Sequence, residues 1–254
     1  MDEEKAVQGL KDVKEVFDKV GIKFWLKDGT LLGAIRDRKV IEWDTDIDMG
    51  AWYKEVDKIV STFPELKKRG FNVFFPYKPN QNSMLEISRP GCVIGVSLYR
   101  VSGGYAWVIS PHGDNPLTGR ITKNLMHMLS QRIFSTKPDG KFKILKFLIS
   151  LLPFKRYFYE IVWTIWEKTS GKYEAGIYPK QFFEKLRTIN FYGMKFNVPS
   201  ETEKYLEYVY GPDWKTPKKE WNYTVDDGSY IYPVRIEDLL KGKKSLKRLV
   251  KVNA

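Results

Sequence analysis

The stretch Leu26-Lys-Asp-Gly-Thr-Leu-Leu-Gly-Ala-Ile-Arg36, followed closely by Trp43-Asp-Thr-Asp-Ile-Asp48, is the most informative part of this chain of 254 residues. The apolar run at 22–27 predicts a buried strand, and Asp28-Gly-Thr30 allows a tight turn into a short helix over 31–36. The second segment predicts another strand. Together they predict a strand, turn, helix and strand unit.

Three aspartates, Asp44, Asp46 and Asp48, stand at alternate positions of the second segment. Side chains at such positions of an extended chain point to one side, so the three carboxylates would share a face. Crowded carboxylates repel one another unless a cation lies among them, and oxygen ligands suit Mg²⁺ or Mn²⁺. Amides at the helix start, the Thr30 hydroxyl and the Arg36 guanidinium would bind phosphate oxygens nearby. The sequence therefore predicts a metal-assisted phosphate site.

These segments resemble a known family, the LicD and fukutin-like transferases, which belong to the wider nucleotidyltransferase-fold group. Members are similar to "L-D-G-T-L-L-G-x-x-R" followed by "I-P-W-D-x-D-I-D", and residues 27–36 and 41–48 follow these patterns. A later block, Pro199 to Pro217, is similar to a family segment in which a helix ends in Tyr-Gly and is followed by tryptophan and proline. The two blocks bracket most of the chain, and the middle matches loosely.

The chain departs from the family pattern at two positions. Glu42 replaces the usual proline before the tryptophan. On a later strand, where the family carries a further metal-binding aspartate, this chain has Gly95. Glu86 on the preceding strand is our preferred replacement and Asp114 the alternative; with neither, the chemistry would be weakened or lost.

The resemblance implies transfer of a phosphorylated alcohol, such as a phosphocholine or polyol-phosphate group, from a CDP-linked donor to a glycan or glycolipid hydroxyl. Asp46 and Asp48, with Glu86, would bind the metal, and one of the three clustered aspartates would act as base. Asp44 would bind metal, orient another ligand, or make only a local turn bond. The residues expected to bind substrate are Asp28, Gly29, Thr30, Arg36 and Trp43.

Two other functions stay open. One is a nucleotidyltransferase that acts on a small molecule or a nucleic acid, with nucleic acid the less favoured partner. The other is a degenerate family member that binds a nucleotide or glycan without turnover. The glycine at position 95, where the family has an acid, is consistent with this alternative. For the block around Tyr210, Gly211 and Trp214 we favour a structural explanation, a helix-ending glycine and a buried tryptophan.

The fold class that we expect is α/β (α+β), a nucleotidyltransferase-like mixed sheet flanked by helices, with a helical C-terminal region. Residues 1–135 would form the catalytic core, and 136–254 a mainly helical region that completes the same unit and ends in a basic tail. The periodicity predicts helices over 3–20, 53–63 (stopped at Pro64) and near 121–134, and strands over 48–52, 71–77, 84–88, 92–101 and 105–110.

The composition bears on disulfide bonds, on zinc binding and on the compartment that we expect. A single cysteine, Cys92, excludes an intrachain disulfide framework, and two histidines make a zinc site improbable. His112 and His127 are expected to be structural or surface residues. The N-terminal sequence lacks the basic start and apolar run of a secretory signal, so we expect a cytoplasmic setting.

The apolar stretch at 144–166 and the formal charge of +12 bear on partners. Charged residues and Pro153 interrupt the stretch, so it would not cross a bilayer; it packs in the core or lies on a membrane surface, or contacts a second copy in a homodimer. The basic run at 241–251 would attract anionic lipid, a lipid-linked acceptor or nucleic acid, or would simply be solvated.

Overall fold

The fold is taken from a computed structural model, which describes residues 1–75, 83–112, 121–122, 125–126, 129, 155–169, 172–242 and 246. The expected helix over 121–134 falls largely outside these residues, as do Asp114, His127, residues 144–154 and most of the basic run at 241–251. The five described positions between 121 and 129 are helical.

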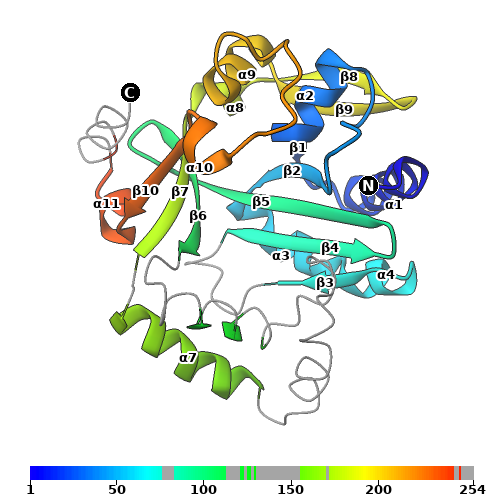
Figure 1. The fold of residues 1–254 in the computed structure, drawn as a ribbon. Helices are drawn as coiled ribbons and strands as arrows, with labels where there is room; N and C mark the ends of the chain where they lie inside the picture. Colours follow the sequence, from blue (N-terminus) through cyan, green and yellow to red (C-terminus); the bar gives the residue numbers. More distant parts are fainter. Residues whose placement is uncertain are drawn as a thin grey trace.

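A mixed sheet forms the centre of the described fold (Figure 1). Its strands are β1 (Phe24–Leu26), β2 (Ile47–Trp52), β3 (Asn72–Phe74), β4 (Met84–Arg89), β5 (Cys92–Ser102), β6 (Tyr105–His112), β7 (Lys172–Pro179) and β10 (Tyr230–Val234). They run in the order β1-β2-β5-β6-β7-β10, with β4 on β5 and β3 on β4. A separate hairpin consists of β8 (Leu186–Phe191) and β9 (Met194–Pro199). The expected mixed α/β class is confirmed.

The long strand β5 joins the two halves of this sheet. Residues 94–99 pair with β2 in parallel, and residues 92–97 pair with β4 in antiparallel on the other side. Farther along, residues 100–102 turn through Gly103 and Gly104 into β6, as the expected hairpin requires. In this register Asp48 lies opposite Gly95, and Gly95 opposite Glu86. Because opposite residues point to the same side of a sheet, the three positions share a face.

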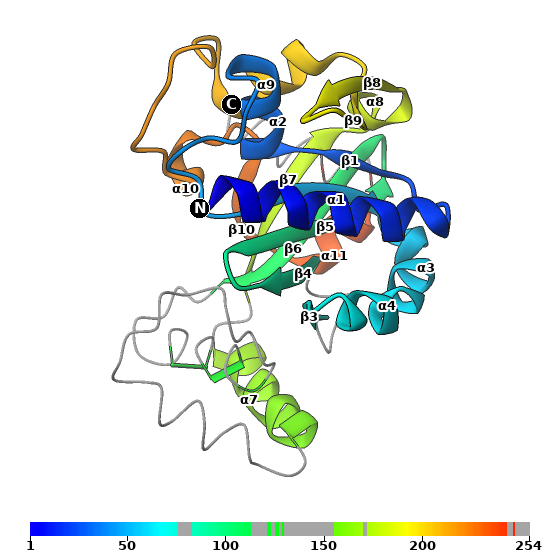
Figure 2. The same cartoon turned by 90° about the vertical axis from the view of Figure 1, so that its right-hand side faces the viewer.

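Helices lie around the sheet, most of them packed on one hydrophobic core and the last of them on a second. They are α1 (Glu3–Lys19), α2 (Asp28–Arg36), the 3₁₀ turn η1 (Tyr53–Glu55), α3 (Val56–Ser61), α4 (Phe63–Lys68), α8 (Gln181–Glu184), α9 (Thr202–Tyr210), α10 (Tyr223–Asp226) and α11 (Ile236–Leu240). Figure 2 shows α1 running across one face of β5. The contact is close because Gly9 of α1 leaves room for the buried Cys92 side chain.

The helix α7 (Lys155–Thr169) packs on a second core against β6 and β7. Its Tyr159, Trp163 and Trp166 are buried there, whereas Tyr157, Phe158, Ile161 and Ile165 are exposed. The part of the stretch at 144–166 that is described thus has one face in the protein core. None of the helices in the described ranges is long and apolar enough to cross a bilayer.

One local expectation was wrong, and one group of strands was not expected. Pro64 does not end a helix; it lies in the first turn of α4, where its missing N–H leaves no hydrogen bond unmade. The described part of the region after residue 136 holds strands β7 to β10 beside its helices, and these strands were not expected. The strand β7 alternates buried Tyr173, Ala175 and Ile177 with more exposed neighbours, the period-2 pattern of a strand.

The close approach of β1 and β2 depends on Gly50. A Cβ at this position would overlap the indole of Trp25, which is fully buried among Trp52, Tyr99 and Phe183. We expect Gly50→Ala to lower the free energy of unfolding by about 1–3 kcal/mol, because overpacking forces the indole from its site. Gly95→Ala is the control, since a Cβ there has its nearest neighbour, Met84 Sδ, at 3.6 Å. Urea unfolding measures both; equal losses would contradict the explanation.

Candidate active site

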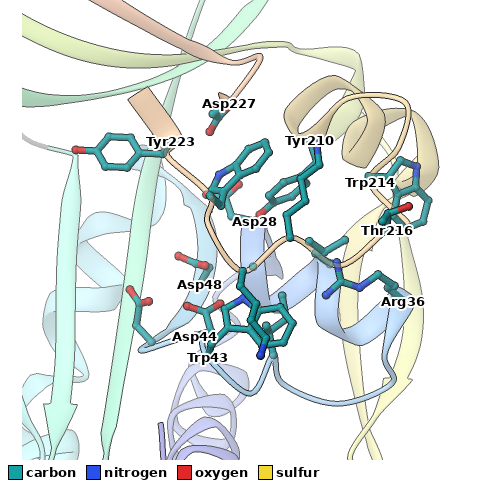
Figure 3. Close-up of a pocket in the computed structure, with 17 residues that line it drawn as sticks. Asp28, Arg36, Trp43, Asp44, Asp48, Tyr210, Trp214, Thr216, Tyr223 and Asp227 are labelled. Atoms are coloured by element: carbon teal, nitrogen blue, oxygen red, sulfur yellow. The ribbon is translucent and has the colours of Figure 1, made fainter. Parts of the chain in front are cut away.

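A cavity of about 410 Å³ opens where α2, the loop before β2 and the segment after α9 meet (Figure 3). Five aspartates line it: Asp28, Asp44, Asp46, Asp48 and Asp227. Aromatic side chains (Trp43, Tyr210, Trp214, Trp221, Tyr223) and basic ones (Arg36, Lys218, Lys219) line it as well. Its size is typical of pockets for small ligands. Segments that are up to about 200 residues apart in sequence therefore form one site.

The predicted acidic triplet does gather at this cavity, but by a different backbone path. The strand β2 begins at Ile47, so only Asp48 lies in the strand, and Asp44 and Asp46 belong to the loop before it. Local hydrogen bonds shape this loop: Asp44 Oδ1 accepts from Thr45 N at 2.8 Å, and Asp44 N donates to Ile41 O at 3.0 Å. The carboxylates therefore converge without a shared strand face.

Gly29 lets two of these carboxylates approach the start of α2. A Cβ at Gly29 would overlap Asp44 Oδ2 and would lie 3.4 Å from Asp48 Oδ2. The next residue, Thr30, is buried, and its Oγ1 accepts from Asp48 N at 2.8 Å. Thr30 thus fixes the start of β2 against α2, in addition to the phosphate contact predicted for it. Gly29 and Thr30 together set the position of Asp48.

A buried lysine lies beneath the acidic side of the cavity. Lys27 is 4% exposed; its Nζ forms an ion pair with Asp28 and donates to Ser97 Oγ at 3.1 Å. The other oxygen of Asp28 accepts from Tyr205 Oη at 2.8 Å. Burial lowers the pKa of Lys27, but Asp28, Tyr178 and Asp48 outweigh it and raise that pKa above its usual value. Lys27 therefore stays charged and offsets part of the negative charge.

Burial and mutual repulsion raise the pKa of the clustered aspartates. For Asp44 burial and then Asp46 raise the pKa to about 6, and for Asp48 burial, Asp46 and Asp28 raise it well above its usual range. Burial also raises the pKa of Asp46, although Lys27 opposes the shift. Such shifts mean that the site holds more negative charge than it solvates well. A bound cation would relieve that cost.

The side chains that could hold a metal are few. Among the described residues, no group of three or more histidine, cysteine, aspartate or glutamate side chains is arranged to bind a metal ion. Glu86 is 3% exposed, lies two strands from Asp48, accepts from Ser88 Oγ at 3.3 Å, and is not among the described residues that line the cavity. Its role as a metal ligand stays a prediction. Asp46 and Asp48 offer hard carboxylate oxygens, and Mg²⁺ often needs only one or two of these besides phosphate oxygens and water.

The predicted substrate contacts Arg36 and Trp43 both line the cavity. The Arg36 guanidinium makes two hydrogen bonds of 2.8 Å to the Asp37 carboxylate, which hold it in place. Trp43 is 40% exposed, and Lys219 Nζ lies 5.6 Å from the centre of its ring. The indole thus offers a partly open aromatic face beside a cation.

Sequence reasoning missed the other side of the cavity. Tyr210 and Trp214, for which a structural explanation was preferred, line it, as do the downstream Lys218, Trp221 and Tyr223. The one signal was the late block resembling the family, which ends at Pro217. Asp227 was also missed, because nothing in its sequence neighbourhood marks it. Burial and then Asp28 raise its pKa to about 6.

Comparison with known proteins gives the same family as the sequence motifs. Residues 21–88 match the family model described as LicD/FKTN/FKRP, nucleotidyltransferase domain. An uncharacterized protein of Rickettsia prowazekii (strain Madrid E) is 34% identical over 68 residues, which are 27% of this chain and 26% of that protein. Human ribitol-5-phosphate transferase FKTN is 23% identical over 223 residues, 86% of this chain and 35% of FKTN. The chain thus spans about a third or less of the length of the curated relatives it matches.

Two further likenesses are narrower. Human ribitol 5-phosphate transferase FKRP is 42% identical over 41 residues, which are 16% of this chain and 8% of FKRP. The solved structure of the antibiotic-resistance factor ANT(2'')-Ia matches 67% of this chain and 94% of that one, at 12% identity and a TM-score of 0.32, too low a score to support an argument.

The raised pKa of Asp227 predicts a pH-dependent stability effect. A carboxyl group whose pKa is higher in the folded state stabilises the fold at low pH and loses that contribution as pH rises through about 6. We expect the free energy of unfolding of Asp227→Asn to be about 1–2 kcal/mol higher than that of wild type at pH 7.5, because the variant has no buried charge at this position. The difference should be smaller at pH 4.5, where the wild-type carboxyl group is largely protonated.

Urea unfolding in EDTA measures this difference. Asp226→Asn, at the exposed neighbouring position, is the control and should change the free energy by less than about 0.5 kcal/mol. A gain for Asp227→Asn that is the same at both pH values would contradict the assignment of the cost to this ionised group.

Proposed function

We propose that the chain transfers a phosphorylated alcohol from a CDP-linked donor to a hydroxyl of a glycan or glycolipid, as expected of a LicD-like protein, since residues 21–88 match the LicD/FKTN/FKRP model. The main support is the composition of the cavity, which is lined by five carboxylates together with aromatic and basic side chains. A nucleoside diphosphate conjugate has matching parts, since its base can stack on an aromatic ring and its phosphates can contact cations. The relatives named as ribitol-phosphate transferases support the same class of reaction.

Asp46 and Asp48 would hold a Mg²⁺ or Mn²⁺ ion, completed by donor phosphate oxygens and water. Their carboxylate oxygens suit such ions, and their pKa values are raised by burial and by repulsion from neighbouring aspartates, costs that a bound cation would offset. When bound, the ion supplies charge stabilisation for the diphosphate and for the leaving nucleotide. Asp44, held by Thr45 N and packed against Gly29, would orient the neighbouring ligands.

The remaining cavity residues would bind and orient the donor. Arg36, fixed by Asp37, would present its remaining N–H groups to a phosphate oxygen. Lys218 and Lys219 would contribute positive charge from the opposite segment, and Trp43 or Trp221 would stack on the base. Closing these groups around the diphosphate would exclude water from the reacting phosphorus.

The first test of this function removes one carboxylate. We expect Asp46→Asn and Asp48→Asn each to lower Mg²⁺-dependent CMP release from CDP-ribitol or CDP-choline by at least about 100-fold, because the charge that holds the cation is lost. The readouts are CMP release and Mn²⁺ binding by calorimetry, and Asp57→Asn, exposed on α3, is the control. Full turnover in both variants would exclude the assigned role, and a wild type without turnover would favour the degenerate, binding-only alternative.

The second test adds the carboxylate that the family pattern has where this chain has Gly95. The position lies opposite Asp48, and a Cβ there would have its nearest neighbours at 3.6 and 3.9 Å. We expect Gly95→Asp to bind Mn²⁺ about tenfold more tightly in the absence of donor, because an added negative oxygen ligand raises affinity. The neutral variant Gly95→Asn is the matched control. Equal affinities in the two variants would contradict a metal site beside Asp48.

A further inference from the structure

Asp227 is held rigidly at the cavity by its neighbours. Its Oδ1 accepts two hydrogen bonds of 2.7 Å, from the backbone N and the Oγ of Ser229. Ser229 is itself 1% exposed, and its carbonyl accepts from Ile177 N of β7 at 2.9 Å. These bonds use one oxygen of the carboxylate. In the described part of the chain, no hydrogen bond reaches the other oxygen, Oδ2.

Gly228 fixes the same segment against α9. Its N–H donates to Val209 O at 3.0 Å, and a Cβ at this position would overlap the carbonyl of Tyr208. The backbone that follows Asp227 therefore has little freedom to move. Figure 3 shows the Asp227 carboxylate pointing into the cavity from the side away from Asp44 and Asp48. The structure thus presents one oxygen of a fixed carboxylate to the cavity.

The other carboxylates of the cavity are engaged. Asp28 uses one oxygen for Lys27 and the other for Tyr205. Asp44 accepts from Thr45 N and packs on Gly29, and under the proposed function Asp46 and Asp48 hold the cation. Strand β5 offers no carboxylate at Gly95. Asp227, on the opposite side of the cavity, is a carboxylate that has an oxygen without a hydrogen bond from the described residues and is assigned neither to Lys27 nor to the cation.

Asp227 has the electrostatic setting of a proton acceptor at neutral pH. Burial and the charge of Asp28 raise its pKa to about 6, whereas Ser229 and Lys27 oppose the rise. A base is most effective when its pKa is close to the working pH. The ionisable groups whose charges interact with it across this packing are Lys27, Asp28, Tyr99, Tyr178, Tyr208 and Tyr210.

We propose, resting on the proposed function, that Asp227 is the general base that activates the acceptor hydroxyl. Asp227 Oδ2 takes the hydroxyl proton while the hydroxyl oxygen forms a bond to the phosphorus that carries the alcohol. The bond from that phosphorus to the bridging oxygen of the diphosphate breaks, and CMP leaves with its electron pair. Attacking and leaving oxygens lie roughly in line in such transfers. A base across the cavity from the cation ligands meets this requirement.

Asp227→Asn tests the proposal, with CMP release from CDP-ribitol and CDP-choline measured in water and with a panel of methyl glycosides as acceptors. The side chain keeps its shape and can still accept from Ser229, but it can no longer take a proton. We expect kcat to fall by about 10²- to 10⁴-fold, while the dissociation constant of the donor, measured by calorimetry, changes by less than about twofold. Asp226→Asn is the matched control and should retain the wild-type rate.

Chemical rescue separates a base from a structural role. In Asp227→Ala, added formate can enter the vacated space and accept the proton, so we expect it to restore CMP release at least about fivefold, and to restore none in Asp46→Ala. Ser229→Ala, which removes one hydrogen bond from Oδ1 and keeps the carboxylate, should lower kcat by a factor of about 3 to 10. Ser229→Ala thus tests the role of Asp227 without removing its carboxylate.

Each outcome has a distinct meaning. A kcat within fivefold of wild type in Asp227→Asn, or a loss of donor affinity as large as the loss of rate, would overturn the role of Asp227 and leave the proposed function standing. Absence of formate rescue in a folded Asp227→Ala would also overturn it. A wild type that binds CDP conjugates but releases no CMP with any acceptor would overturn the proposed function, and the role of Asp227 with it.

Discussion

Negative charge crowded around the buried ammonium group of Lys27 is the constraint on which the rest of the site depends. Two like charges 4 Å apart repel by about 4 kcal/mol at an effective dielectric constant of 20. Lys27 forms an ion pair with Asp28 and opposes the rise in the pKa of Asp46 and Asp48. Four aspartates besides Asp28 line the same cavity, however, so the pKa values stay raised. The fold must hold these groups together against their repulsion. It does so with hydrogen bonds from Thr45 N to Asp44 and from Ser229 to Asp227, and with the contact between Thr30 and Asp48.

The acidic cluster lowers the stability of the fold, so it must be attached to a part of the molecule that is stable. Strands β2 and β5 are buried along most of their length, and α1 packs on β5, so the acidic loop is attached to a rigid part of the molecule. A site that concentrates unsatisfied charge is well suited to bind an oppositely charged ligand, because binding removes a cost that already exists in the free protein. The same logic explains the basic groups on the cavity wall. Arg36 and Lys218 are paired with Asp37 and Asp213, which lie outside the acidic cluster and orient each cation without neutralising the carboxylates.

The part of the site that could be predicted from sequence is the part encoded locally. Residues 22–48 contain a buried strand, a short helix and an acidic segment in succession, and each is recognisable from its own residues. The tight turn expected at 28–30 is instead the first turn of that helix, which begins at Asp28. The exact path of Asp44 and Asp46 was not predictable from alternation alone. Local hydrogen bonds within the segment 41–45 hold it in a turn, so the extended strand begins only at Ile47. Glu86 was correctly placed on a strand next to that of Gly95, but whether it reaches a metal depends on side-chain geometry that no spacing encodes.

The remaining half of the cavity could not be predicted, because its residues lie far in sequence from those of the first half. Asp227 lies about 180 residues after Asp48 and reaches the cavity only because β10 pairs with β7, and Gly228 packs on the end of α9. A reaction requires groups at fixed positions in space, and any segment that the fold brings there can supply them. In this chain the position opposite Asp48 on β5 is a glycine, and a carboxylate with one open oxygen stands at the opposite wall. For an in-line displacement the two places are not equivalent: an acid on β5 would lie on the side of Asp46 and Asp48, whereas Asp227 lies on the other side of the cavity, from which the acceptor hydroxyl approaches in the role proposed for it.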